Sequence, residues 1–217
     1  MSTAMYERLW QALLDTIVMV GVSAVFALAV GIPLAVFLVL SGPGGLIHAP
    51  RLNRVLAALI NGFRATPFIV LLVALLPLTR LLTGTTIGVW AAIVPLSISA
   101  TPFFARIAEV SLREVDGGLI EAAQAIGCRR WHIVRHVLLP EALPGIVGGF
   151  TITIVSMIGA SAMAGAIGAG GLGDMAIRYG YQRYDTTVMA MVIVVLIALV
   201  CLVQFTGDYA VRRLRAR

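Results

Sequence analysis

Three glycines in the stretch AIGAGGLGD have the spacing of a nucleotide-binding motif. Gly168, Gly170 and Gly173 satisfy the pattern G-x-G-x-x-G, in which glycines let the backbone approach the pyrophosphate of a dinucleotide. The pattern has this function only after a buried β-strand and at the start of a helix, within a βαβ unit of about 30 residues. The elements around these glycines therefore decide whether a dinucleotide is bound.

The composition predicts that those elements lie in a membrane. Hydrophobic residues make up 60% of the 217 residues and charged residues 12%, whereas ordinary soluble domains are about 45–50% apolar. All sixteen basic residues are arginine, whose charge has to lie outside the hydrocarbon or be paired. The residues before the first apolar run include Glu7, Arg8 and Asp15, and they lack the basic region and the cleavage site of a signal peptide. We therefore expect the first span to be retained.

Five apolar runs are long enough to cross a bilayer, whose core about 30 Å thick needs roughly 20 residues of helix. The glycine motif follows the fourth run with no strand before it, which excludes a dinucleotide site and favours close packing and a sharp turn. Ala27, Gly31 and Ala35, spaced four apart in the first run, also predict close helix packing. We therefore expect an all-α integral membrane protein with five transmembrane helices, at about residues 16–40, 55–78, 86–105, 143–167 and 186–206.

The arginines are distributed unequally between the two sides of this arrangement. Positive residues collect in cytoplasmic loops, and here they follow the first and third spans and end the chain. We expect one domain over residues 1–217, with the N-terminus outside, the C-terminus in the cytoplasm and a cytoplasmic region at about 111–140. The arginines on the expected cytoplasmic side are Arg51, Arg54, Arg106, Arg113, Arg129, Arg130, Arg135, Arg212, Arg213, Arg215 and Arg217.

The cytoplasmic region predicts two short helices joined by a turn at Gly127, because glycine readily adopts the left-handed conformation. Asp116 is placed to cap the first helix, and Pro140 is expected to end the second. Both helices have an apolar stripe, and an apolar face turned to the cytoplasm suits the groove of a partner protein. The stripes comprise Leu119, Ala122 or Ala123, and Ile126 on the first helix, and Trp131, Val134 and Leu138 on the second.

Three other functions of this region have weaker support. A helix-turn-helix that binds DNA would need a third helix and a core of its own, which a unit of about 35 residues between two spans lacks. A second alternative is a solvated basic loop, but such a loop needs no apolar face and would leave the two apolar stripes unexplained. His132 and His136 are four residues apart without a third ligand, so we expect no metal site, and no nucleic acid as a partner.

The same region carries the residues of a known signature. Glu121-Ala122-Ala123, Gly127 and Val137-Leu138-Leu139-Pro140 match the pattern E-A-A-x-x-x-G-x9-I-x-L-P, with Val137 in place of Ile. In these residues the chain resembles the permease subunits of bacterial ABC importers. Further stretches, RATPFIVLL, VLLPEALPG, SAMAGAIGAGGLGD and QFTGD, are similar to methionine importer permeases over nearly the whole chain.

The resemblance implies a type I ABC importer permease fold, a homodimer in the bacterial inner membrane, and a pathway for L- and D-methionine that works by alternating access. It also implies a substrate-binding protein and a separate dimeric ATPase. The sequence has no G-x-x-x-x-G-K-[ST] loop, so ATP and Mg²⁺ belong to the ATPase, and we expect this chain to bind no cofactor and to be no enzyme. The residues implied to couple to the ATPase are Glu121, Ala122, Ala123, Gly127, Leu139 and Pro140.

Two alternatives to this function remain open. One is an importer for another small amino acid. The other is an ATP-independent secondary transporter, although the expected spans contain none of the Asp or Glu residues typical of such carriers. A membrane-bound enzyme is disfavoured, because the sequence shows no pairing of a nucleophile with a base.

The fourth span supplies the residues expected to line the pathway, which are Ser161, Met163, Gly165, Thr151 and Ser156. The flexible and polarisable thioether of Met163 suits a gate, and filling a gap between helices is the alternative. Arg64 is either a functional charge inside the membrane or a residue whose long side chain reaches the headgroups. The outer loop at 168–185, with its tyrosines, either receives the binding protein or lies at headgroup level.

Overall fold

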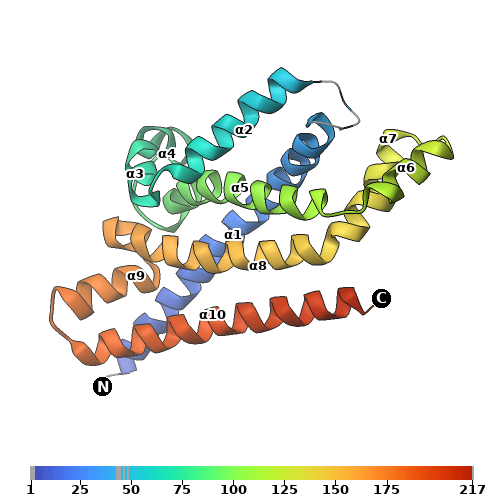
Figure 1. Cartoon of the computed structure of the whole chain (residues 1–217). Helices are drawn as coiled ribbons and strands as arrows, with labels where there is room; N and C mark the ends of the chain where they lie inside the picture. The colour runs from blue at the N-terminus through green and yellow to red at the C-terminus, as the bar shows by residue number, and fades with distance from the viewer. Residues whose placement is uncertain (1–2, 43–44, 46, 48, 217) are drawn as a thin grey trace.

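Long helices form the body of the molecule. The computed structural model describes residues 3–42, 45, 47 and 49–216, and all regular structure in those residues is helical. Helix α8 (Leu139–Ala164) lies between α5 (Val89–Arg113) and α10 (Thr186–Arg215), and α1 (Thr3–Ser41) crosses behind them (Figure 1). By length and composition each of these four helices suits a membrane span. The expected all-α membrane fold is confirmed.

The second expected span, residues 55–78, is not one continuous helix, and that prediction is corrected here. Helices α2 (Pro50–Ala65) and α3 (Phe68–Ala74) are together apolar enough to cross a membrane, but they are bent by 107° relative to each other. Pro67 explains the break, because proline has no amide N–H and forces the preceding residue out of the helical conformation. Thr66 is accordingly extended, with ψ 125°, and α4 (Leu76–Thr83) follows α3.

The other spans are extended by residues outside the apolar runs. Helix α5 continues beyond residue 105 because Glu109 pairs with Arg106 at 2.7 Å and with Arg113 at 2.9 Å along its surface. Helix α1 begins at Thr3, well before the expected residue 16, and α10 continues to Arg215. An apolar run predicts the part of a helix that lies in hydrocarbon, whereas polar residues continue the helix into water.

Pro140 does not end the helix that precedes it, contrary to the expectation. The chain remains helical from α7 (Arg130–Ile133) through the wide turn η1 (Val134–Leu138) into α8. Pro140 lies at the start of α8, directly after the wide turn η1, in which the amide of Leu139 donates to the carbonyl of Val134 five residues back, and this wider turn accommodates a proline that has no amide N–H. The segment before α8 is therefore directly continuous with a membrane-spanning helix.

Small residues let α1 and α5 approach closely. Ala27, Gly31 and Ala35 are buried on α1, as expected from their spacing. Phe104 of α5 is fully buried and packs edge to face on Phe150 of α8, with the ring centroids 5.3 Å apart. The predicted packing of this ladder is confirmed.

The glycine-rich segment forms a compact turn after α8. The turn η2 (Gly165–Ala169) leads into the short helices α9 (Gly171–Met175) and η3 (Ala176–Tyr181), which return toward the start of α10 (Figure 1). Gly168, Gly170 and Gly171 have φ of 97°, 85° and 77°, values that suit glycine. The amide of Leu172 donates to the Thr16 hydroxyl at 2.9 Å. These glycines allow the tight turn, and no strand precedes them in the described chain, so they lack the strand–turn–helix context of a dinucleotide-binding motif.

Candidate coupling surface and pathway residues

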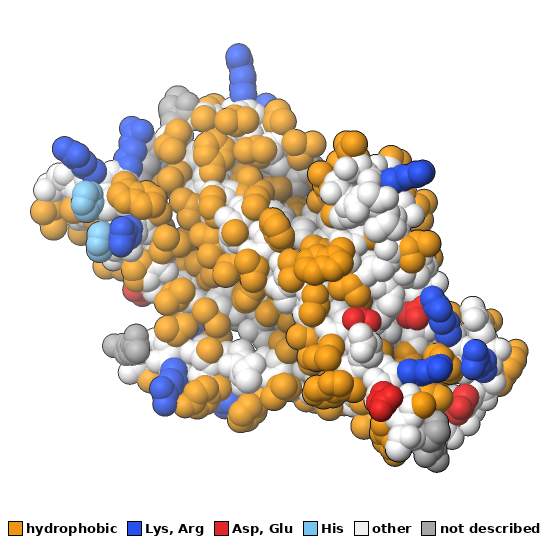
Figure 2. Space-filling model, turned by 180° about the vertical axis from the view of Figure 1, so that it is seen from behind, with side chains coloured by type: hydrophobic (Ala, Val, Ile, Leu, Met, Phe, Trp, Pro, Cys, Tyr) orange, Lys and Arg blue, Asp and Glu red, His pale blue; other side chains and the backbone are white. Residues whose placement is uncertain are grey.

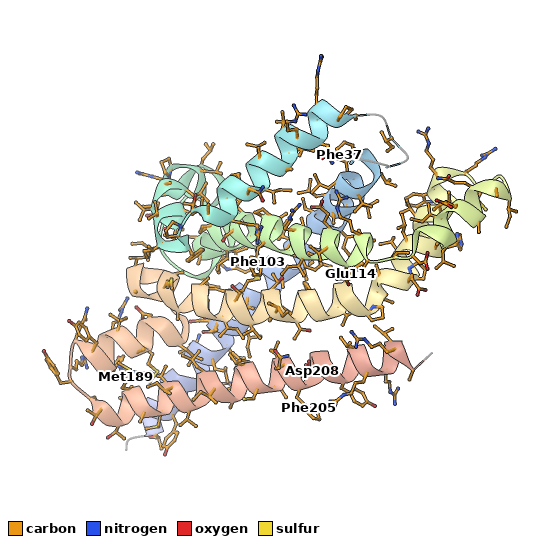
Figure 3. All side chains as sticks on the ribbon, in the orientation of Figure 1. Phe37, Phe103, Glu114, Met189, Phe205 and Asp208 are labelled. Atoms are coloured by element: carbon orange, nitrogen blue, oxygen red, sulfur yellow. The ribbon has the colours of Figure 1, made fainter. Side chains whose placement is uncertain are left out.

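A small helical unit projects from the end of the bundle between α5 and α8. We call α6 (Gly117–Ala125), α7 and η1 together the hairpin unit, residues 117–138. Glu114 marks the end of α5 from which the hairpin unit departs (Figure 3). Asp116 caps α6, since its carboxylate accepts a hydrogen bond from the amide of Gly118 at 2.6 Å. Gly127 follows with φ 82°, so both local predictions are confirmed.

The inner side of the hairpin unit packs on the ends of the long helices. Ala123, Ile133, Val134 and Leu138 are buried in one cluster with Leu112 of α5. The same cluster includes Ala142 and Ile146 of α8 and Ala35 of α1. A force applied to the hairpin unit therefore acts directly on three of the long helices.

The outer side of the hairpin unit carries large apolar side chains that the described residues of the chain leave exposed. Ile126 is 83% exposed, Trp131 64% and Leu119 46%. Trp131 was expected to share a face with Val134 and Leu138, but it points outward while those two are buried, because α7 is only one turn long and passes into the wide turn η1. The exposed apolar residues form a surface that suits a protein partner.

The residues expected at the coupling site divide between the two sides of the hairpin unit. Glu121, Ala122 and Gly127 are exposed and accessible to a partner. Ala123 is buried and supports them from inside. Leu139 and Pro140 lie outside the hairpin unit, in the first turn of α8, where Leu139 is half-buried and Pro140 exposed.

Basic side chains surround this surface. Arg129, Arg130 and Arg135 are exposed, and the rings of His132 and His136 stack with their centroids 5.8 Å apart. Arginine and histidine side chains gather at the left end of the face in Figure 2, over the hairpin unit. Within the part of the chain that the structure describes, no group of three or more potential metal ligands occurs, so the two histidines lack the further ligands of a typical metal site.

The predicted pathway residues of α8 do not share one environment. Thr151, Ser161 and Gly165 are buried in the packing of this chain. The hydroxyl of Thr151 donates to the carbonyl of Val147 at 3.0 Å, and that of Ser161 to the carbonyl of Ile158 at 2.7 Å. Their hydroxyls are satisfied within the helix rather than presented to a solute.

Ser156 and Met163, by contrast, belong to an exposed stripe along α8. The stripe comprises Ile152, Ser156, Gly159 and Met163, at helical spacings of four, three and four, and all four are exposed. Met163 is 51% exposed, so it does not fill a gap within this chain. The stripe is the face of α8 that another helix or a solute can contact.

Arg64 lies in the last turn of α2, immediately before the break at Thr66 and Pro67. Its side chain is exposed and lines a cavity between the broken span, α5 and α8. The structure thus places Arg64 and Ser156 on the wall of the same cavity.

The sequence interpretation missed the ionic cluster near the end of α5. Glu109 is only 2% exposed and binds both Arg106 and Arg113. A Cβ at Gly42 would lie 2.9 Å from Nη2 of Arg113, so this arginine reaches the end of α1. The spacing of the three residues, at i+3 and i+4 on one helix, is the signal that would have revealed the cluster.

At the opposite end of the bundle, Tyr179 of η3 lies between two arginines. Arg8 of α1 donates a hydrogen bond to its hydroxyl, and the Arg183 guanidinium carbon lies 4.7 Å from its ring centroid. Tyr181 and Tyr184 nearby are exposed. This end of the chain thus presents aromatic and basic side chains together. Figure 2 shows basic and acidic side chains gathered toward the lower right.

Comparisons with known proteins agree with this architecture. The family described as binding-protein-dependent transport system inner membrane component matches residues 31–216. The chain is 51% identical to a probable D-methionine transport system permease protein of Vibrio cholerae, over 97% of this chain and 94% of that protein. It is 44% identical to the corresponding protein of Pasteurella multocida, over 96% of this chain and 98% of that protein.

Solved structures show the same fold. An inward-facing structure of a methionine ABC transporter contains a chain that is 48% identical and superposes with a TM-score of 0.97, with 99% of each chain covered. A structure of an amino acid ABC transporter with histidines superposes with a TM-score of 0.73 at 20% identity, over 96% of this chain and 93% of that chain. The second likeness concerns the fold alone.

Proposed function

Because the chain belongs to the family of inner membrane components of binding-protein-dependent transport systems, we propose that it forms the membrane pathway of an ATP-driven methionine importer. The observation that carries this proposal is the likeness, along 99% of the chain, to a subunit of a methionine ABC transporter. Both L- and D-methionine are proposed as substrates, since the relatives are named for D-methionine transport.

The hairpin unit is proposed to couple this chain to an ATPase. Its apolar surface of Leu119, Ile126 and Trp131 is exposed next to Glu121 and Ala122, while its inner side packs on α1, α5 and α8. The sequence lacks a phosphate-binding loop, so ATP and Mg²⁺ are bound by the partner subunit, and this chain is not itself catalytic. Closure of the ATPase subunits would press on the hairpin unit and rotate the long helices.

The pathway is proposed to lie between two copies of this chain. The exposed stripe of α8, with Ser156 and Met163, supports this arrangement because it is left uncovered by the helices of a single chain. Met163 is proposed as a gate that contacts an apolar solute without holding it. Alternating access requires that solute affinity differ between the two orientations, and ATP supplies that bias.

The two ends of the bundle are proposed to face different compartments. The hairpin unit and the arginine-rich end of α10 face the cytoplasm, as the positive-inside rule requires. The start of α1 and the loop with Tyr181 and Tyr184 face outward and receive a substrate-binding protein.

Uptake by the reconstituted complex tests the function. This chain, its ATPase and its binding protein are placed in vesicles, and labelled methionine is supplied on the side of the binding protein with ATP on the other. We expect ATP-dependent uptake that unlabelled methionine inhibits better than other amino acids. ATP-dependent uptake of another amino acid only would reject methionine as the substrate, and uptake independent of ATP would reject the importer mechanism.

A further inference from the structure

A cavity opens where the second span is broken, and it lies at mid-length of the bundle. Its walls come from the break itself, from residues 96–103 of α5 and from residues 153–160 of α8. These stretches lie near the middle of Val89–Arg113 and toward the middle of Leu139–Ala164. Phe103 is one of the α5 residues on this wall (Figure 3). The cavity therefore lies at mid-length of α5 and beside the second half of α8.

The wall of this cavity combines three kinds of side chain. Arg64 is its one charged residue among the described part of the chain. Hydroxyl groups come from all three structural parts, with Thr66 at the break, Ser99 on α5 and Ser156 on α8. Phe68, Phe103 and Met157 supply apolar surface. A binding site that is apolar with a few convergent polar groups is the usual form of a small-molecule site.

The charge of Arg64 is not neutralised within the described chain. The ion pairs there join Arg106 and Arg113 to Glu109, and Arg178 to Asp174. The cavity wall contains no Asp or Glu. A guanidinium at mid-length of a membrane bundle is costly without an anion, so its position favours a bound anionic group.

We infer that Arg64 binds the carboxylate of the transported amino acid. The planar guanidinium suits a carboxylate because it can donate two parallel hydrogen bonds. The hydroxyls of Ser99 and Ser156 accept from the ammonium group, and Phe103 and Met157 contact the side chain. The inference rests on the proposed function, and it adds a residue that recognises the carboxylate common to amino acids rather than the methionine thioether.

The first test compares transport by Arg64→Gln with transport by Arg80→Gln in the reconstituted complex. Arg80 is an exposed arginine of the neighbouring helix α4 that does not line the cavity. We expect methionine uptake per ATP hydrolysed to fall about 10-fold in Arg64→Gln, the loss that follows from removing a charged hydrogen bond. Arg80→Gln should match the wild type, and Arg64→Lys should retain intermediate uptake. Co-elution with the ATPase and a wild-type melting temperature in detergent establish that Arg64→Gln is folded.

A lipid headgroup is a second source of an anion for Arg64, and the vesicle composition separates the two sources. The uptake measurement is repeated in phosphatidylcholine vesicles and in vesicles that contain anionic phosphatidylglycerol. We expect the same loss in both. A loss seen only with phosphatidylglycerol would show that Arg64 binds the headgroup, which overturns the inference.

The second test measures ligand binding to the permease–ATPase complex in the absence of the substrate-binding protein, so that the specificity of the substrate-binding protein does not affect the result. Saturation-transfer NMR on the permease–ATPase complex compares methionine with methioninol, in which a hydroxymethyl group replaces the carboxylate. We expect the wild type to favour methionine and Arg64→Gln to lose that preference. Equal uptake by Arg64→Gln and the wild type would overturn the inference. So would an Arg64→Gln complex that still prefers methionine to methioninol. Either result leaves the proposed function standing. A wild-type complex that imports no methionine overturns the proposed function and, with it, the inference.

Discussion

Gly31 of α1 lies directly against Phe104 of α5, and there is no space between them for a methyl group. A Cβ built at Gly31 would be 2.7 Å from Cδ1 of Phe104 and 3.4 Å from the carbonyl oxygen of Thr101. Phe104 cannot move aside easily, because it is fully buried and packed on Phe150. This contact between the first membrane helix and α5 therefore depends on glycine.

We expect Gly31→Ala to destabilise the protein by about 1–3 kcal/mol, because overpacking forces side chains or backbone to shift. Gly21→Ala on the same helix is the control, since a Cβ at Gly21 has no atom within 4 Å. Thermal unfolding in detergent measures both. A melting temperature for Gly31→Ala equal to that of Gly21→Ala would contradict the close contact.

Gly127 should be sensitive to residues that avoid a positive φ. Its φ of 82° strains a β-branched side chain, whereas asparagine tolerates this region. We expect Gly127→Val to lower methionine uptake and ATPase association several-fold while membrane insertion stays normal, and Gly127→Asn to be much milder. Co-purification with the ATPase and vesicle uptake measure the two effects; equal losses in both variants would reject the role of the conformation.

The exposed apolar surface of the hairpin unit should bind the ATPase. Ile126 is 83% exposed, so Ile126→Ser removes apolar contact area without disturbing the core. We expect a several-fold weaker association with the ATPase and an unchanged melting temperature of the isolated permease. Leu81→Ser provides the control, because Leu81 is 81% exposed on α4, outside the hairpin unit. Equal ATPase binding by both variants would place the coupling surface elsewhere.

Met163 provides a test of the pathway face. If the α8 stripe lines the route, a bulky Met163→Trp should obstruct it and reduce uptake strongly, while Met163→Leu should retain most activity because its volume is similar. Leu143→Trp, on an exposed part of α8 outside the stripe, is the control. Vesicle uptake at matched protein amounts distinguishes them. Undiminished uptake by Met163→Trp would remove Met163 from the pathway.

Glu109 should contribute to stability through its two arginines. Glu109→Gln leaves Arg106 and Arg113 without their anion, and we expect a loss of about 1–3 kcal/mol. The loss is smaller than for a fully buried pair because the arginine side chains are 39% and 42% exposed. Thermal unfolding measures it, with Arg51→Gln as a surface control. An unfolding temperature as high as that of the control would show that the cluster adds nothing to stability.

Several features of this protein follow from the sequence alone because they depend on neighbouring residues or on composition. Apolar runs predicted the membrane helices α1, α5, α8 and α10, since only a long apolar helix satisfies its backbone in lipid. Asp116 and Gly127 predicted the start and end of α6, because capping and a positive φ are local properties. The signature around Glu121 predicted the family, which the matched residues 31–216 confirm.

The tertiary structure alone decided which faces of those helices are covered. Lipid and a neighbouring helix both accept apolar or small side chains, so composition does not distinguish the buried Ser161 from the exposed Ser156 on the same helix. Pro67 allows a break in the second span, but the 107° bend and the position of Arg64 at the cavity go with the packing of α2 against α5 and of α3 against α5 and α8. Local chemistry thus determined the elements, whereas contacts between distant residues determined the site.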